Sequence, residues 1–302
     1  MTHALRNVLR NKIINGWSLF YLISAPISFA MIVAIGWGDL STGPGISALI
    51  QLSVRCAVPP LYMAFAASSI HALLSSDGSA WMLRNRKYFG LSFAVAMAWQ
   101  AFFIVWMVAG YTDYYVHEVY LTKDAIEGTL GYLFLIPMVV TSFKPGRRLL
   151  SRKNWNRLHT VGIYYLWAYA FSVYWWSIFY YETPVFLDYL FYVSGFLVWG
   201  FRAGAWVKLR RKKTRKESPN TRPVRSVESI GLVAVGVGVV GVFSGSLWRT
   251  SAEEVLYGYK WTAPLEAFVP YWPLEPFLPL LMISFGAYLI GKALSALRSV
   301  RP

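Results

Sequence analysis

Long apolar stretches separated by short polar segments make up most of this chain. Eight of these stretches are long enough, or nearly so, to cross a bilayer, which takes about 20 apolar residues in a helix. In chain order they cover residues 17–37, 46–74, 88–110, 128–143, 159–180, 186–207, 230–247 and 270–290. The pattern therefore predicts an all-α integral membrane protein with about eight transmembrane helices.

The seventh stretch carries small residues at helical spacing. Ala234, Gly238, Gly241 and Gly245 recur at intervals of three and four residues, which places them on one face, where another helix can approach closely. The same segment also spells G-x-G-x-x-G, but a dinucleotide site needs that motif between a strand and a helix. We therefore expect close helix packing here and no nucleotide cofactor.

Composition and charge support a membrane protein. Hydrophobic residues make up 56% of the chain and charged residues only 14%, against about 25% charged residues in average soluble domains. Cys56 is the single cysteine, which excludes a disulfide framework and a cysteine-rich metal site. The formal net charge is +15, but the basic residues lie between apolar stretches. We therefore expect the lipid bilayer as a partner and no nucleic acid.

The distribution of basic residues predicts an orientation. Lys and Arg crowd the polar segments on one side of the predicted membrane and are scarce on the other, and the side rich in Lys and Arg is cytoplasmic. The crowded segments are residues 84–87, 144–157, 208–225 and 292–301, whereas the opposite side holds Lys123, Arg249 and Lys260. No Ala-x-Ala-like cleavage site follows the first apolar stretch. Both termini are therefore expected in the cytoplasm, with the first helix retained.

Charge and apolar content divide the chain into four segments. An N-terminal tail and first helix precede a five-helix bundle, a basic cytoplasmic linker and a two-helix extension. These segments cover residues 1–45, 46–207, 208–227 and 228–302.

Two histidines lie where a membrane protein could hold an iron. His71 and His159 are placed near the cytoplasmic ends of the second and fifth predicted helices, at similar depth. Ionisable residues within membrane helices are candidates for function, and neutral imidazole is an axial ligand of haem iron. The alternative is that each histidine packs or caps near an interface. His117, in an outer loop beside Asp113 and Glu118, is expected in a solvated loop and not in a metal site.

Three motifs carry a family resemblance. The run from Arg84 to Leu91 combines a basic cluster with Gly-Leu, Thr141-Ser142 precedes a basic loop, and Trp155-Asn-Arg-Leu-His159 matches a Trp-x-x-Leu-His signature. In these motifs the chain resembles the ferric-reductase-like transmembrane domain family, and most closely the membrane haem subunit of bacterial methionine-sulfoxide reductase systems. The resemblance covers about a third of the chain, and its spacing extends over residues 46–207. It implies a ferric-reductase-like bundle followed by a C-terminal helix pair, in the inner membrane of a bacterium.

The chain departs from this family at two positions. The family carries haem-ligand histidines where this sequence has Gln100 and Ser172, so both ligands on the outer side of the membrane are missing. His159 matches a family ligand, whereas His71 lies on a helix where the family places none. No flavin or nicotinamide domain follows the bundle, so electrons would have to come from a quinone or from a separate protein.

Two functions remain open at this point. In the first, the chain is an electron-transfer subunit with at most one b-type haem, held on the cytoplasmic side by His159 with His71. In the second, it is a haem-free structural or assembly subunit of a membrane complex. Both imply a protein partner, and neither assigns a catalytic residue. Transport through the bundle has little support, because acidic residues within the predicted helices are nearly absent.

Overall fold

The computed structural model describes residues 3–181, 183–217, 224–257, 265, 268–272 and 274–292. Within these ranges the chain is helical and contains no strand, so the all-α prediction is confirmed there. Contacts divide the chain into two compact units. Unit 1 comprises residues 1–71 and 75–170, and unit 2 comprises residues 72–74 and 171–302.

Among the described residues, five helices are long and apolar enough to cross a membrane. They are α2 (Trp17–Trp37), α3 (Gly43–Leu74), α4 (Asp77–Gly110), α9 (Phe186–Glu217) and α10 (Arg225–Phe243). The other three predicted spans are helical in α6 (Thr122–Val140), α8 (Arg152–Phe179) and α13 (Leu278–Lys292), but none of these helices is both long and apolar enough to be counted with the five. The chain is therefore a membrane protein with several apolar helices, and the predicted number of eight is not confirmed.

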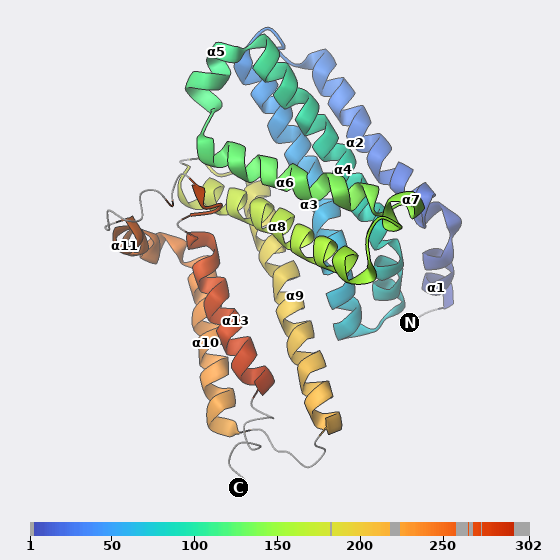
Figure 1. Cartoon of the computed structure of the whole chain (residues 1–302), viewed down its shortest axis with the longest axis vertical. Coiled ribbons are helices and arrows are strands. Elements are labelled where there is room, and N and C mark those ends of the chain that lie inside the picture. Colours follow the sequence, from blue (N-terminus) through green and yellow to red (C-terminus); the bar gives the residue numbers. More distant parts are fainter. Residues whose placement is uncertain are drawn as a thin grey trace. The chain divides into compact units, whose positions relative to one another are not determined.

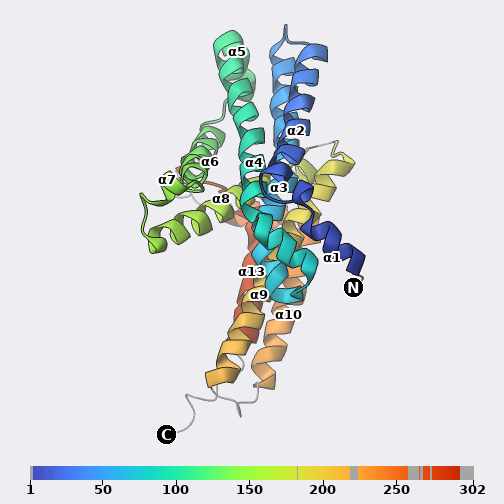
Figure 2. The same cartoon turned by 90° about the vertical axis from the view of Figure 1, so that its right-hand side faces the viewer.

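Unit 1 is built on three helices that run alongside one another, α2, α3 and α4 (Figures 1 and 2). Apolar side chains from all three form a common core: Met31, Ile46, Leu49, Phe103 and Met107. Two side-chain hydrogen bonds tie α2 to α4: the Ser24 and Ser92 hydroxyls lie 3.1 Å apart, and the Trp99 indole N–H donates to the Ser28 hydroxyl. Figure 1 shows α6 and the first part of α8 crossing these helices at a steep angle.

Short elements complete unit 1. They are α1 (His3–Arg10), η1 (Lys12–Ile14), α5 (Thr112–Tyr114), the π-helical turn η2 (Tyr115–Val119) and α7 (Lys144–Arg147). The turn α7 joins α6 to α8 and carries Lys144 and Arg147 of the basic loop that was predicted to be cytoplasmic.

Two helix ends differ from the prediction for local reasons. The third span was expected to begin at residue 88, but α4 begins at Asp77, because Ser76 and Ser79 form a capping box there. The sixth was expected to end at residue 207, but α9 continues to Glu217. Lys and Arg are good helix formers, so the basic runs at 84–87 and 208–216 extend these helices and do not interrupt them.

In unit 2, α10 and α13 pack closely side by side (Figures 1 and 2). A Cβ atom added at Gly238 would lie 2.7 Å from the Pro279 carbonyl oxygen of α13, and one added at Gly241 would lie 3.3 Å from the Pro279 ring. Ala234 is buried as well. The predicted small-residue face is therefore confirmed at these three positions.

The fourth position of that face was predicted wrongly. The helix α10 ends at Phe243, and a new helix, α11 (Gly245–Tyr257), begins within the segment expected to span the membrane and continues into the expected outer loop. A Cβ atom at Gly245 would lie 2.5 Å from the Trp175 ring and 2.9 Å from Phe179. Gly245 therefore packs against the end of α8 and not against α13.

Candidate functional site

His159 is held at two points within unit 1. It lies in the third turn of α8, and its Nε2 atom is 3.0 Å from the hydroxyl of Thr141, the residue that ends α6. The indole of Trp155 contacts its ring in a tilted arrangement, with centroids 4.3 Å apart and 33° between the ring planes. The Trp155 indole N–H also donates to the Thr141 carbonyl oxygen at 3.1 Å. Together these contacts tie the start of α8 to the end of α6.

The hydrogen bonds of Thr141 determine where the imidazole carries its proton. The Thr141 hydroxyl lies 2.7 Å from the Pro137 carbonyl oxygen, which can only accept a hydrogen bond. Because a hydroxyl has one proton, it donates to Pro137 and accepts from His159. The Nε2 atom of His159 is therefore protonated in this arrangement and has no lone pair at that nitrogen for a metal.

His71 lies in a different environment. Its Nδ1 atom is 3.0 Å from the hydroxyl of Ser79, the same serine that closes the capping box at the start of α4. His71 is not among the residues that line the cavity beside His159. The structure therefore gives His71 a capping contact at the α3–α4 corner and does not bring it to His159 through that cavity.

The two residues at the positions where the family resemblance predicts haem ligands, Gln100 and Ser172, are both buried. The Gln100 side-chain oxygen lies 2.9 Å from the Tyr132 hydroxyl, which is equally close to the Met97 carbonyl oxygen. Ser172 is 3% exposed and belongs to unit 2, whereas Gln100 belongs to unit 1. The buried Gln100 amide oxygen is therefore within hydrogen-bond distance of the Tyr132 hydroxyl.

The outer-loop histidine makes a backbone contact. The Nδ1 atom of His117 is 2.8 Å from the Asp113 carbonyl oxygen, and the side chain is exposed. Among the described residues, no group of three or more His, Cys, Asp or Glu side chains is arranged to hold a metal ion. The fourth histidine, His3, has a side chain outside the described part of the structure.

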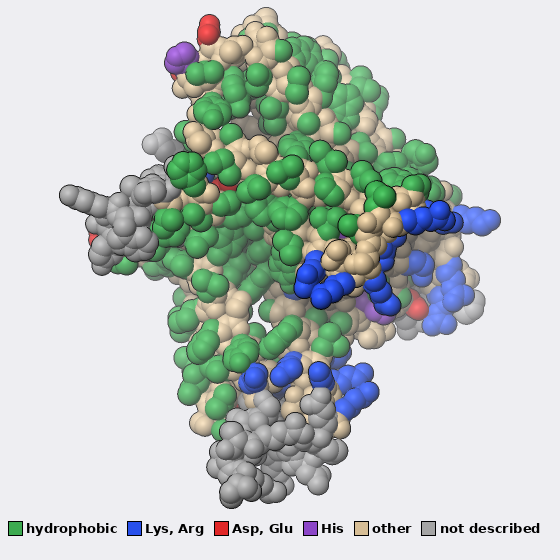
Figure 3. Space-filling view, viewed as in Figure 1, with side chains coloured by type: hydrophobic (Ala, Val, Ile, Leu, Met, Phe, Trp, Pro, Cys, Tyr) green, Lys and Arg blue, Asp and Glu red, His purple; other side chains and the backbone are tan. Residues whose placement is uncertain are grey.

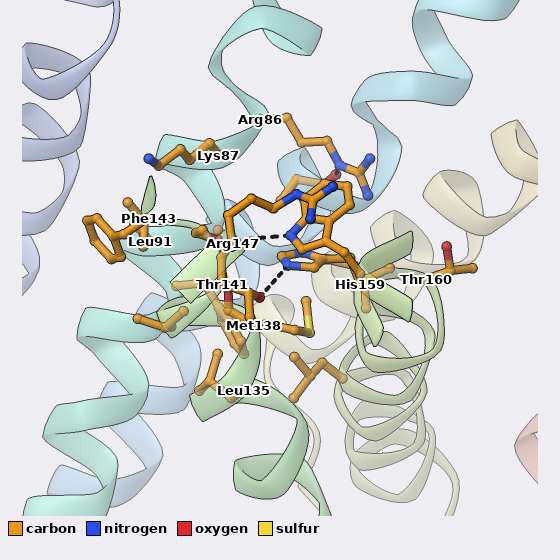
Figure 4. Close-up of a pocket in the computed structure, with 18 of the residues that line it drawn as sticks. Arg86, Lys87, Leu91, Leu135, Met138, Thr141, Phe143, Arg147, His159 and Thr160 are labelled. Atoms are coloured by element: carbon orange, nitrogen blue, oxygen red, sulfur yellow. Dashed lines mark hydrogen bonds between the residues drawn. The ribbon is translucent and has the colours of Figure 1, made fainter. Parts of the chain in front are cut away.

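A cavity of about 540 Å³ opens beside His159. Its walls come from α3, α4, α6, α7 and α8, all within the part of the chain that forms unit 1. Figure 4 shows Arg86, Arg147 and His159 gathered on one side of it, with Leu135 and Met138 on another. Sequence reasoning did not predict this cavity, although the basic clusters at 84–87 and 144–147 that border it were apparent and were attributed to topology.

The cavity has a basic rim and an apolar floor. The basic rim consists of Arg84, Arg86, Lys87, Lys144 and Arg147. The apolar floor consists of Leu61, Leu91, Phe93, Leu135, Ile163 and Leu166, all buried. Among the lining residues that the structure describes there is no Asp or Glu. Lys and Arg side chains also gather over α7 and the start of α8 in the space-filling view (Figure 3).

Local contacts position two of the guanidinium groups. Arg86 Nε donates to the Ala64 carbonyl oxygen at 2.9 Å, and Arg147 Nη1 donates to the Leu150 carbonyl oxygen at 2.9 Å. The Arg147 guanidinium carbon lies 5.0 Å from the centre of the Trp155 ring, within the range of a cation–π contact. The cavity therefore combines fixed positive charge with apolar surface, a combination suited to an anionic amphiphile.

The family resemblance stays a prediction. Comparisons with protein-family models, with curated proteins and with solved structures found no match to this chain.

Proposed function

We propose that this chain is a haem-free subunit of a membrane complex, with a structural or assembly role. The observation that carries the proposal is the engagement of His159. Its Nε2 atom contacts the Thr141 hydroxyl, so a metal could bind that nitrogen only if the contact were broken, and the unprotonated nitrogen that a ligand needs would otherwise be Nδ1 alone. The capping contact of His71 and the presence of Gln100 and Ser172 at the remaining ligand positions support the same conclusion.

A subunit with a single b-type haem is the second candidate. The cavity beside His159 has several cations at its rim, and such groups suit the carboxylates of a haem. The described residues nevertheless fit a haem poorly, because His159 would have to leave Thr141 and no second imidazole lines the cavity. A quinone or a redox protein would be the electron donor in that case.

The hydrogen bond between Thr141 and His159 provides the test. Thr141→Val and His159→Phe each remove one partner, so each should lower stability by about 1 kcal/mol. The double variant should lose little more than either single variant, because it leaves no polar group unpaired. Thermal unfolding in detergent measures this coupling, and absorption spectra of the same preparations from haem-replete cells should show no haem band.

The two candidates differ in the spectra they require. If His159 held a haem, the unmodified protein would show a Soret band that persists in Thr141→Val and disappears in His159→Phe. That result would overturn the haem-free proposal. More than one haem per chain in a pyridine haemochrome assay would contradict both candidates.

We further propose that the chain lies in the inner membrane of a bacterium with both termini in the cytoplasm. The support is the concentration of Lys and Arg around α7, the start of α8 and the end of α9, since such residues favour the cytoplasmic side. Apolar side chains on α10 remain exposed, including Val233 at 65% and Val240 at 66%, and suit contact with lipid.

This orientation predicts opposite accessibility for two positions. In a Cys56→Ser background, a cysteine in place of Tyr114 should react with an impermeant maleimide added outside intact cells. A cysteine in place of Lys212 should react only after permeabilisation. Three predicted spans, over residues 128–143, 159–180 and 186–207, lie between the two positions in the chain. Labelling of both from the same side would exclude the proposed topology.

A further inference from the structure

The cavity in unit 1 offers chemistry that neither candidate function uses. Among the described residues, its basic rim carries five cationic side chains and its lining includes no carboxylate. Arg84 already donates to the Leu9 carbonyl oxygen and to Asn15, which leaves Lys87 and Lys144 as exposed side chains of the rim. Lysine and arginine are the usual protein partners of phosphate groups. A ligand with an anionic head is therefore favoured over one with an uncharged head, such as a quinone.

The apolar floor requires a ligand with a hydrocarbon part. Its six side chains come from α3, α4, α6 and α8 and are buried. Gly90 of α4 also lines the cavity, and a Cβ atom added there would meet nothing within 4 Å. An inorganic phosphate could contact the rim but would leave this surface uncovered, whereas an acyl chain would cover it.

Aromatic residues beside the rim place it at the edge of a membrane. The Trp17 ring stacks on Phe143 with centroids 6.2 Å apart and meets Tyr88 edge-on at 5.5 Å. The Lys87 ammonium lies 4.9 Å from the centre of the Phe143 ring. Trp and Tyr are enriched where a membrane protein passes from hydrocarbon to headgroups, and basic pockets on the cytoplasmic side bind acidic headgroups.

From these observations we propose that the cavity binds one anionic phospholipid of the cytoplasmic leaflet. The phosphate lies at the basic rim near Lys87 and Lys144, and an acyl chain lies along the apolar floor past Gly90. The site holds a structural lipid between α4, α6 and α8, and binding requires both parts of the ligand.

The head of the ligand is tested by charge removal. The full chain in a neutral detergent is titrated against a fluorescent phosphatidylglycerol. Binding to Lys87→Gln/Lys144→Gln should weaken about fivefold for each cation removed, the usual worth of one basic residue at an anionic lipid surface. The matched control is Arg148→Gln/Lys153→Gln, which removes the same charge from exposed residues outside the cavity and should leave binding unchanged.

The tail of the ligand is tested by filling the cavity. Gly90→Leu adds a side chain to the open space without changing the charge, so it should abolish binding. Since glycine destabilises a helix interior, this variant should melt no lower than the unmodified protein, which distinguishes a blocked site from a misfolded one. Gly36→Leu is the control, because a Cβ atom at Gly36 also meets nothing within 4 Å and Gly36 is outside the cavity.

Competition identifies the ligand class. Unlabelled phosphatidylglycerol should displace the probe, whereas phosphatidylcholine, a quinone analogue and inorganic phosphate should not. Displacement by phosphatidylcholine or the quinone would overturn the proposal, and displacement by phosphate alone would identify a simple anion site. The proposal would also be overturned if Lys87→Gln/Lys144→Gln and the control Arg148→Gln/Lys153→Gln weakened lipid binding equally. Unchanged lipid binding by a folded Gly90→Leu protein would overturn it as well.

Discussion

Replacing Gly238 by leucine should separate α10 from α13, whereas the same replacement at Gly236, two residues away, should be tolerated. A Cβ atom at Gly238 would lie 2.5 Å from Ile283 Cγ1 and 2.7 Å from the Pro279 carbonyl oxygen, so backbone would have to move. A Cβ atom at Gly236 meets nothing within 4 Å. Alanine should distinguish the two positions as well. Gly238→Ala should lower the stability by about 1–3 kcal/mol, because it overpacks the contact. Gly236→Ala should raise the stability by about 0.5–1 kcal/mol, because alanine favours a helix interior over glycine.

The measurement is thermal unfolding of the four variants in one detergent, together with protease sensitivity of the segment that joins α9 to α10. Gly241→Leu should fall between the two leucine variants, because its Cβ atom would lie 3.3 Å from a proline ring and not from a carbonyl group. Equal melting temperatures for Gly238→Leu and Gly236→Leu would show that the α10–α13 contact does not stabilise unit 2.

Replacing Tyr180 by phenylalanine should destabilise unit 2 by about 1.5–3 kcal/mol, the usual worth of hydrogen bonds to acidic groups. The Tyr180 hydroxyl lies 2.5 Å from Glu253 of α11 and 2.5 Å from Glu275 of η4 (Glu275–Phe277). Glu275 is 0% exposed. The Arg249 guanidinium carbon lies 4.2 Å from the centre of the Tyr180 ring. Without the hydroxyl, two acidic groups at this junction lose the donor that they share.

The adjacent tyrosine provides a matched control. Tyr181 is 67% exposed, so Tyr181→Phe should leave the melting temperature unchanged. Thermal unfolding of both variants, with tryptophan fluorescence as the signal, makes the comparison. If Tyr180→Phe melted like Tyr181→Phe, the hydroxyl would not be a structural link between α8, α11 and η4.

The helices themselves were predictable, but several of their ends were not. Apolar content over about 20 residues identifies a membrane helix, and α2 was predicted with the bounds the structure shows. The start of α4 depends on a capping box formed by Ser76 and Ser79, and a window of hydropathy does not register such hydrogen bonds. The predicted spans over α6, α8 and α13 depended on apolar content alone, and none of these helices is both long and apolar enough to be counted with the other five.

The small residues of α10 were predictable from their spacing, but the residues of the helix that packs against them were not. Spacing placed Ala234, Gly238 and Gly241 together, and the structure agrees. It did not reveal Gly286 of α13, where an added Cβ atom would lie 2.5 Å from the Gly231 carbonyl oxygen. Close approach requires small residues on both partners, and the pattern of one helix contains no information about the other.

The sequence by itself determined the helical content and the membrane character, because these follow from local composition and period. Only the tertiary structure decided that His159 donates to Thr141, that His71 contacts Ser79, and that two basic clusters border one cavity. The reason is physical. A hydrogen-bond partner and a cavity wall depend on side chains from helices far apart in the chain, and periodicity along one helix describes only which face a residue occupies.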